Sequence, residues 1–176
     1  LGIHPYDALT LNDVVFPEWK KWIEADDRVV AIGEIGLDYY KSDIPKYKQR
    51  DAFKRQLDFA ANMKLPVIIH NRQADDDTLE ILSDYPDVPA VFHCYGSDLS
   101  FAKELWKRNY LTSFTGIITY PNAGELRKVV KECPYDLFMV ETDCPFLAPQ
   151  AFRGKRNEPS FVVEVVKKIA EIKGWE

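Results

Sequence analysis

Short apolar segments alternate with amphipathic stretches along the chain, and this alternation constrains the fold more than any other feature. Apolar runs of strand length occur at 29–32, 66–70, 90–93, 110–115 and 137–141. Stretches with helical spacing of apolar residues occur at 17–26, 46–63, 75–84, 98–108, 122–131 and 160–172. Strands and helices that alternate over short connections predict a parallel sheet with crossover helices, so the expected fold class is α/β. The strands are continuous apolar runs, which indicates that both sheet faces are buried.

The length and composition indicate an ordinary globular domain. The 176 residues suffice for one core, and no linker or repeat interrupts them, so we expect a single domain over 1–176. No apolar run approaches the roughly 20 residues of a membrane helix, and the start does not resemble a secretory signal. These features predict a cytoplasmic protein that does not enter a membrane. The cysteines at 94, 133 and 144 form no Cys-x-x-Cys pair, which indicates reduced thiols rather than a structural zinc knuckle.

The net charge of −5 bears on nucleic-acid binding. Proteins that hold duplex DNA through phosphate contacts usually carry a basic face. The acidic charge therefore argues against a simple DNA-binding module. It argues only weakly against a nuclease in which metal ions meet the phosphate.

Four predicted strands end in a residue type that binds metal ions, namely Glu34, His70, His93 and Asp143. In a (β/α) barrel the carboxyl ends of all strands meet at one face, which holds the active site. We therefore expect these side chains to converge. Buried charged groups need partners, and a divalent cation satisfies all four. Imidazole and carboxylate suit Zn²⁺, Mn²⁺ or iron, and more carboxylate or water shifts the preference to Mg²⁺.

Each of these residues also has an interpretation without a metal. A histidine after an apolar strand can be a hydrogen-bonded core residue, and Glu34 can cap the segment that follows it. Asp143, which precedes Cys144 and a proline, can form an Asx turn. His4 stands at another apparent strand end, where it either lines the pocket or belongs to a turn before Pro5.

Seven motifs in one order resemble the TatD family of metal-dependent deoxyribonucleases, a branch of the amidohydrolase-like barrels. The motifs lie at 2–5, 31–39, 65–72, 91–94, 113–116, 141–145 and 153–159. The resemblance implies an α/β fold of the TIM (β/α)8 type, with about six of the eight βα units in this chain. It also implies DNA, single-stranded or at its ends, as the substrate.

The resemblance assigns roles to the metal-binding candidates. Glu34 would bridge two divalent ions, which could be zinc, magnesium or manganese. His70 and His93 would complete one metal site. Asp143 would serve the other and would orient or deprotonate the attacking water, so Asp143 and Glu34 are the expected catalytic residues. Asn157 would help to shape the loop after the last strand.

Five further residues are candidates for binding substrate. The resemblance places His4 and Arg72 at the substrate pocket, and Arg153 in the last loop is a candidate phosphate contact. Tyr39 and Tyr40 follow the Glu34 strand, where they would either stack on a base or pack within their loop.

Two departures from the family pattern stand out. The family opens with a His-x-His strand that supplies two ligands to the metal shared with Asp143, and this chain has no His-x-His. We therefore expect the N-terminal strands, and part of the final helix, to be missing. The second departure is the 94–97 segment, Cys-Tyr-Gly-Ser, where the family has an aromatic residue, a hydroxyl residue and then glycine. This loop is expected to be reshaped.

The predicted function is hydrolysis of an ester bond, most specifically cleavage of DNA phosphodiesters by metal-activated water. One alternative is a related barrel hydrolase that acts on another ester, such as a mischarged aminoacyl-tRNA, or on an amide. Another alternative is an inactive remnant. The sequence leaves the native metal and the oligomeric state open.

Overall fold

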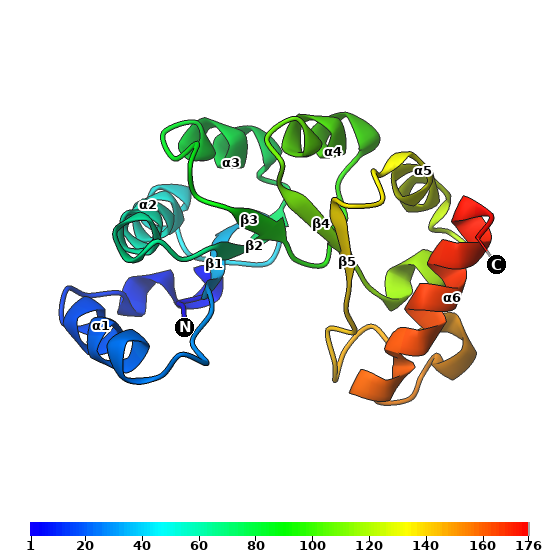
Figure 1. The fold of residues 1–176 in the computed structure, drawn as a ribbon, viewed down its shortest axis with the longest axis horizontal. Helices are drawn as coiled ribbons and strands as arrows, with labels where there is room; N and C mark the ends of the chain where they lie inside the picture. The colour runs from blue at the N-terminus through cyan, green and yellow to red at the C-terminus, as the bar shows by residue number, and fades with distance from the viewer. Residues whose placement is uncertain (176) are drawn as a thin grey trace. The chain divides into compact units, whose positions relative to one another are not determined.

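The structure is a computed structural model that describes residues 1–175. Its chain divides into two compact units, Leu1–Phe92 and His93–Glu176. Each unit joins parallel strands to helices (Figure 1). The expectation of a single domain over 1–176 stays a prediction, and the two units are described separately below.

The first unit contains three parallel strands in the order β1-β2-β3. In chain order its elements are the 3-10 helix η1 (Pro5–Thr10), α1 (Val15–Ala25), β1 (Ile32–Asp38), α2 (Lys46–Met63), β2 (Val67–Arg72), α3 (Asp75–Leu82) and β3 (Ala90–Phe92). The predicted helix at 46–63 has the observed bounds of α2. This alternation agrees with the predicted α/β fold class.

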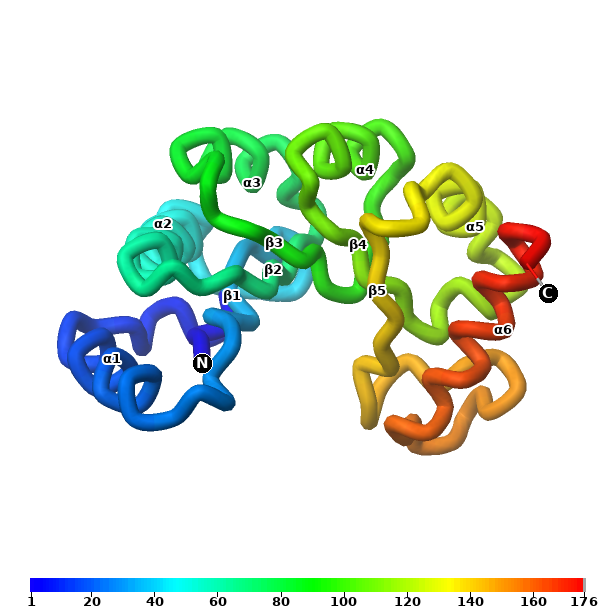
Figure 2. Tube along the Cα trace, viewed as in Figure 1, coloured from blue at the N-terminus to red at the C-terminus, as the bar shows by residue number. Residues whose placement is uncertain are grey.

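The second unit contains the parallel pair β4–β5. Its elements are α4 (Leu99–Trp106), β4 (Leu111–Phe114), η2 (Gly116–Thr119), α5 (Gly124–Glu132), β5 (Phe138–Val140), η3 (Gln150–Phe152), η4 (Pro159–Phe161) and α6 (Val162–Lys173). Helix α6 lies beside both α5 and η2 (Figure 2). It ends at Gly174, whose φ of 68° is the left-handed conformation that commonly terminates a helix.

Strand β1 differs from its prediction, because it runs on to Asp38 instead of ending at Glu34. Ile35 and Leu37 are fully buried and continue the apolar core of the strand. Gly36 has a φ of 128°, and a Cβ there would collide with the carbonyl oxygen of His70. Glycine therefore permits the close approach of β1 and β2, although in the sequence it resembles the start of a turn.

The opening segment is extended but is not a strand of the described sheet. Leu1 accepts a 2.6 Å hydrogen bond from the backbone N–H of Gly33, so the segment lies beside β1 (Figure 2). Gln56 of α2 holds it from the other side, since its amide accepts from the Ile3 N–H at 2.7 Å and donates to the Ile3 carbonyl at 3.0 Å. Residues 1–175 thus contain five strands, where about six βα units were expected.

Each unit has its own apolar core. In the first, helix α2 packs against β1, and the fully buried side chains include Leu37, Phe53, Leu57 and Ile69. In the second, they include Leu105, Phe114, Ile118 and Val165. Burying one such side chain stabilises a fold by roughly 1.5–3 kcal/mol, so these cores hold the strand ends in place. Among the described residues, no helix has the length and apolar character needed to cross a membrane.

Candidate metal centre

Glu34 lies at an irregularity in the pairing of β1 with β2. Gly33 pairs with Ile68 and Ile35 pairs with Ile69, so Glu34 is an extra residue between them. A bulge of this kind re-aims the side chain of the extra residue. The Glu34 carboxylate is 40% exposed, and its Oε2 lies 4.0 Å from Nε2 of His4.

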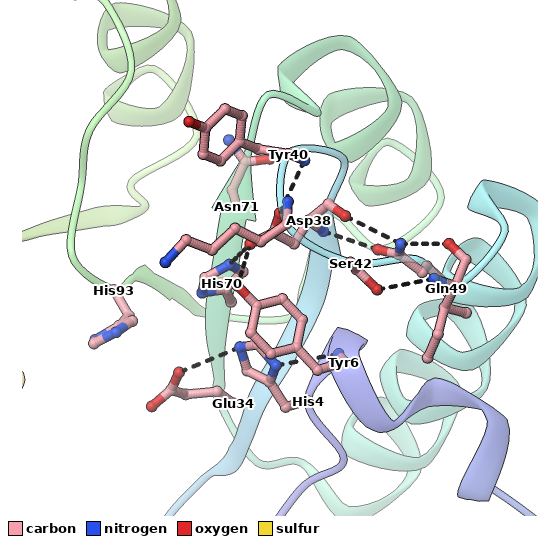
Figure 3. A network of polar contacts seen from close by, with 12 residues as sticks. His4, Tyr6, Glu34, Asp38, Tyr40, Ser42, Gln49, His70, Asn71 and His93 are labelled. Carbon is pink, nitrogen blue, oxygen red and sulfur yellow. Dashed lines mark hydrogen bonds and ion pairs between the residues drawn. The ribbon is translucent and has the colours of Figure 1, made fainter.

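His70 of β2 is oriented by Asp38, which is completely buried at the end of β1. Nε2 of His70 lies 2.9 Å from Oδ2 of Asp38, and the hydroxyl of Tyr6 donates to the same oxygen at 2.9 Å (Figure 3). Oδ1 accepts the backbone N–H groups of Tyr40 and Lys41. Burial raises the pKa of Asp38, but these hydrogen bonds together lower it by more than burial raises it. The pKa of Asp38 therefore lies below its ordinary value.

The ionised Asp38 fixes the tautomer of His70. A carboxylate only accepts hydrogen bonds, so Nε2 of His70 carries the proton and Nδ1 keeps its lone pair. A histidine with one nitrogen bonded to a carboxylate and the other available is the usual form of a metal ligand. Gln49 of α2 holds Asp38 in turn. Its buried side-chain amide accepts the Asp38 N–H at 2.8 Å and donates to the Asp38 carbonyl at 3.1 Å.

His4 completes the group in the first unit. Ligand atoms of His4, Glu34 and His70 all lie within 4.8 Å of one another. Nδ1 of His4, however, accepts the backbone N–H of Tyr6 at 3.2 Å. Burial and the neighbouring His70 lower the pKa of His4, and in its neutral form the proton therefore lies on Nε2, the atom that faces Glu34. This arrangement suits the predicted pocket role of His4 better than metal ligation.

In the second unit, Glu141 orients His93 as Asp38 orients His70. Nδ1 of His93 lies 2.5 Å from Oε2 of Glu141, and Oε1 accepts the backbone N–H of Cys94 at 2.7 Å. Burial raises the pKa of Glu141, but the bonds from His93 and Cys94 outweigh this effect, and the pKa is lowered. Nδ1 therefore holds the proton, and the lone pair lies on Nε2, 3.8 Å from Oδ1 of Asp143.

Asp143 lies in a loop that Asn157 holds in shape. Its φ of 55° is in the left-handed region, which non-glycine residues rarely adopt. The buried amide of Asn157 donates to the carbonyls of Thr142 and Phe146 at 2.7 and 2.5 Å. Asn157 therefore makes the contacts expected of a residue that shapes this loop.

The donor atoms present fit a divalent cation. Glu34 and His70 come together in the first unit, and His93 comes together with Asp143 in the second. Imidazole nitrogen and carboxylate oxygen are ligands that zinc and manganese accept. The second ring nitrogen of each histidine is hydrogen-bonded to a supporting carboxylate, Asp38 for His70 and Glu141 for His93. The convergence of all four residues on one centre stays a prediction.

The predicted substrate residues have different surroundings. The Tyr39 hydroxyl donates to Asp77 at 2.5 Å and the Lys46 ammonium lies 4.2 Å from the Tyr39 ring centre, an arrangement that favours loop packing. The Arg72 guanidinium lies 4.3 Å from the ring centre of Tyr40, which is 57% exposed.

Arg153, the last of these residues, lies over another aromatic ring. Its exposed guanidinium is 4.1 Å from the ring centre of Tyr120. A guanidinium stacked in this way keeps its hydrogen-bond donors available, so the contact is compatible with the predicted role in binding phosphate.

Sequence reasoning missed Asp38, Gln49 and Glu141 as supporting residues. Asp38 and Glu141 each follow an apolar run, a signal that could have marked them as carboxylates in need of partners. Gln49 gave no such signal, because a glutamine within a helix is usually exposed.

Comparison with known proteins decides the family. The family described as TatD related DNase matches residues 1–176. The chain belongs to this family. Similar proteins include YabD of Bacillus subtilis (strain 168), 44% identical over 98% of this chain and 68% of its own length. They also include YcfH of Escherichia coli (strain K12), 39% identical over 98% of this chain and 65% of its own length.

Both relatives are named uncharacterized metal-dependent hydrolases. The chain thus spans about two thirds of the length of these relatives. The family match covers residues 1–176, and the expectation of missing terminal segments stays a prediction.

A solved structure supports the same assignment. The crystal structure of YJJV, a TatD homolog from Escherichia coli k12, superposes with a TM-score of 0.90 at 30% identity and covers 98% of this chain and 67% of its own. The predicted α/β fold of the TatD-type hydrolase barrels is therefore confirmed. Membership of the TatD family also agrees with the coarser prediction of a metal-dependent hydrolase.

Proposed function

We propose that this TatD-family chain is a metal-dependent phosphodiesterase that acts on DNA, most effectively on single strands or ends. The observation that carries the proposal is the pairing of His70 with Asp38 and of His93 with Glu141. In each pair the histidine lone pair points away from the supporting carboxylate, and each pair lies beside a second carboxylate, Glu34 in one unit and Asp143 in the other. This is the donor arrangement of a metal centre.

The proposed metal ligands are Glu34, His70, His93 and Asp143. A bound divalent ion, with two expected per site, would supply Lewis acidity toward a phosphoryl oxygen and a lowered pKa for water. Asp143 accepts the proton of the attacking water, because its carboxylate is partly exposed and its Oδ1 lies 3.8 Å from Nε2 of His93. Arg72 binds the phosphate through its planar guanidinium, which can donate two parallel hydrogen bonds.

The decisive experiment measures hydrolysis of a single-stranded oligonucleotide by the metal-free chain after Zn²⁺, Mn²⁺ or Mg²⁺ is added. We expect metal-dependent cleavage. Asp143→Asn should reduce the rate by about 10²- to 10⁴-fold, the usual contribution of a general base. Asp136→Asn, an exposed carboxylate in the same unit, is the matched control and should leave the rate unchanged.

Three other results would change the assignment. Full activity of Asp143→Asn would remove Asp143 from the catalytic role. Turnover of a mischarged aminoacyl-tRNA or an amide, without cleavage of DNA, would favour the related-hydrolase alternative. An absence of both bound metal and hydrolysis would favour an inactive remnant.

A further inference from the structure

A third metal-binding side chain lies beside His93 and Asp143 in the second unit. Ligand atoms of His93, Cys94 and Asp143 all lie within 4.8 Å of one another, and all three residues are half-buried. Ligands about 2.0–2.3 Å from a tetrahedral zinc ion lie roughly 3.3–3.8 Å apart. Side-chain shifts of about 1 Å would therefore bring the three atoms to bonding distance of one ion.

The backbone directs Cys94 toward its neighbour. In an extended strand, the side chains of adjacent residues point to opposite faces. Cys94 follows His93 directly, but its φ of 45° lies in the left-handed region, and this breaks the alternation. Glu141 fixes the conformation, because one carboxylate oxygen binds the His93 ring and the other accepts the Cys94 N–H.

The three donors differ in chemical character. They comprise an imidazole nitrogen, a sulfur and a carboxylate oxygen. Thiolate is a soft ligand that favours Zn²⁺ over Mg²⁺, and three protein ligands with an open position are typical of catalytic zinc. The Thr115 hydroxyl lies 3.8 Å from the Cys94 sulfur, close enough to support a thiolate from outside the ligand set.

We propose that the Cys94 thiolate is a third protein ligand, beside His93 and Asp143, in a site that selects Zn²⁺ over Mg²⁺. The thiol proton passes to solvent when the sulfur–metal bond forms. This inference rests on the metal dependence proposed above. It departs from the roles implied by the family resemblance, which assign His93 and Asp143 to different ions. It also adds a ligand that the predicted set of Glu34, His70, His93 and Asp143 does not contain. The His4, Glu34 and His70 group has no sulfur and provides an internal contrast.

The first test uses Co²⁺ as a spectroscopic substitute for Zn²⁺ in the 176-residue chain. We expect a near-ultraviolet thiolate-to-cobalt charge-transfer band in the wild-type protein. Cys94→Ser should remove this band. Cys144→Ser is the matched control, because Cys144 is the exposed cysteine next to Asp143, and the band should persist in it. Loss of the band in Cys144→Ser, with retention in Cys94→Ser, would overturn the proposal.

The second test measures metal binding without any activity assay. Cys94→Ser should weaken Zn²⁺ binding by at least the roughly 10- to 100-fold seen when an outer-shell partner is lost, and should leave Mg²⁺ binding nearly unchanged. Zinc X-ray absorption of the wild-type chain should show sulfur at about 2.3 Å, a result that does not depend on how the variant folds.

The outcomes separate this inference from the proposed function. Visible cobalt absorption without a charge-transfer band would reject Cys94 as a ligand and leave the metal-dependent function standing. Failure of the wild-type chain to bind Co²⁺ or Zn²⁺ would reject both. A zinc spectrum with only nitrogen and oxygen neighbours would again overturn the Cys94 assignment alone.

Discussion

Two supporting carboxylates, Asp38 and Glu141, determine which ring nitrogen each candidate histidine presents. Asp38 bonds Nε2 of His70 and leaves Nδ1, whereas Glu141 bonds Nδ1 of His93 and leaves Nε2. Both carboxylates are kept ionised by hydrogen bonds that offset the cost of burial. At the scale of single residues, the supporting carboxylates therefore matter as much as the ligands they orient.

The first prediction concerns Asp38→Asn. The amide can present N–H groups toward His70, so Nε2 is no longer required to carry the proton and the ligand tautomer is lost. We expect metal affinity to fall about 10- to 100-fold, measured by competition with a chromophoric chelator, while circular dichroism stays unchanged. Asp76→Asn, an exposed carboxylate in α3, should bind metal as the wild type does. Unchanged affinity in Asp38→Asn would remove Asp38 from this positioning role.

The second prediction concerns Tyr40, whose exposed ring lies against the Arg72 guanidinium. A base stacked on an aromatic side chain contributes roughly 1–3 kcal/mol to binding of single-stranded nucleic acid. Tyr40→Ala should therefore weaken binding of a single-stranded oligonucleotide, measured by fluorescence anisotropy. Tyr47→Ala removes another exposed tyrosine, 67% accessible, and should have no effect. Equal affinities for Tyr40→Ala and the wild type would exclude base stacking at this ring.

At the scale of elements, the ends and irregularities of secondary structure place the functional side chains. The bulge in β1 sets the direction of Glu34. Asp98 begins α4 as its N-cap, with Oδ1 accepting the Phe101 N–H at 2.9 Å and the Ser100 hydroxyl at 2.7 Å. Because α4 directly follows the loop at 93–98 that contains Cys94, this cap also fixes one end of that loop.

The third prediction concerns this cap. Asp98→Ala should lower the free energy of unfolding by about 1 kcal/mol, measured by urea denaturation, and Asp98→Asn should lower it less. Hydrogen bonds from Phe101 and Ser100 lower the pKa of Asp98 in the folded chain. The stabilisation is therefore present above the unfolded-state pKa of about 3.9 and is lost as the pH falls through the folded-state pKa. The difference between wild type and Asp98→Ala should shrink in acid, and an equal difference at all pH values would contradict this account.

At the scale of the whole molecule, the candidate ligands are divided between two compact units, with Glu34 and His70 in one and His93 and Asp143 in the other. A ligand that binds only the folded chain stabilises it in proportion to the logarithm of its concentration. Metal bound at the proposed ligands therefore raises the free energy of unfolding of the chain.

The fourth prediction follows from this coupling. Zn²⁺ at about 100 times its dissociation constant should add about 2.7 kcal/mol to the free energy of unfolding, and a chelator should reverse the effect. Scanning calorimetry with and without the metal measures the change. Asp143→Asn should show a smaller shift, and Asp136→Asn should match the wild type. A melting temperature that does not respond to metal would contradict a centre of this kind.

Contiguous segments were predicted well from the sequence. Helix α2 spans the predicted residues 46–63, and the strands before His70 and His93 lie where continuous apolar runs placed them. The end of β1 was missed, because Gly36 and Asp38 are residues typical of turns. The local turn preference of these residues does not predict the strand, because Asp38 is buried only through contacts with partners elsewhere in the chain.

The sequence by itself determined the α/β class, the family and the residue types of a metal centre, because periodicity and motif order are local properties. Only the tertiary structure decided which nitrogen of each histidine is available and that Cys94 lies beside His93 and Asp143. These features depend on hydrogen bonds between distant residues, 32 positions apart for His70 with Asp38 and 48 for His93 with Glu141. No local pattern encodes such contacts, since they form only when packing of the separate strands brings their ends together.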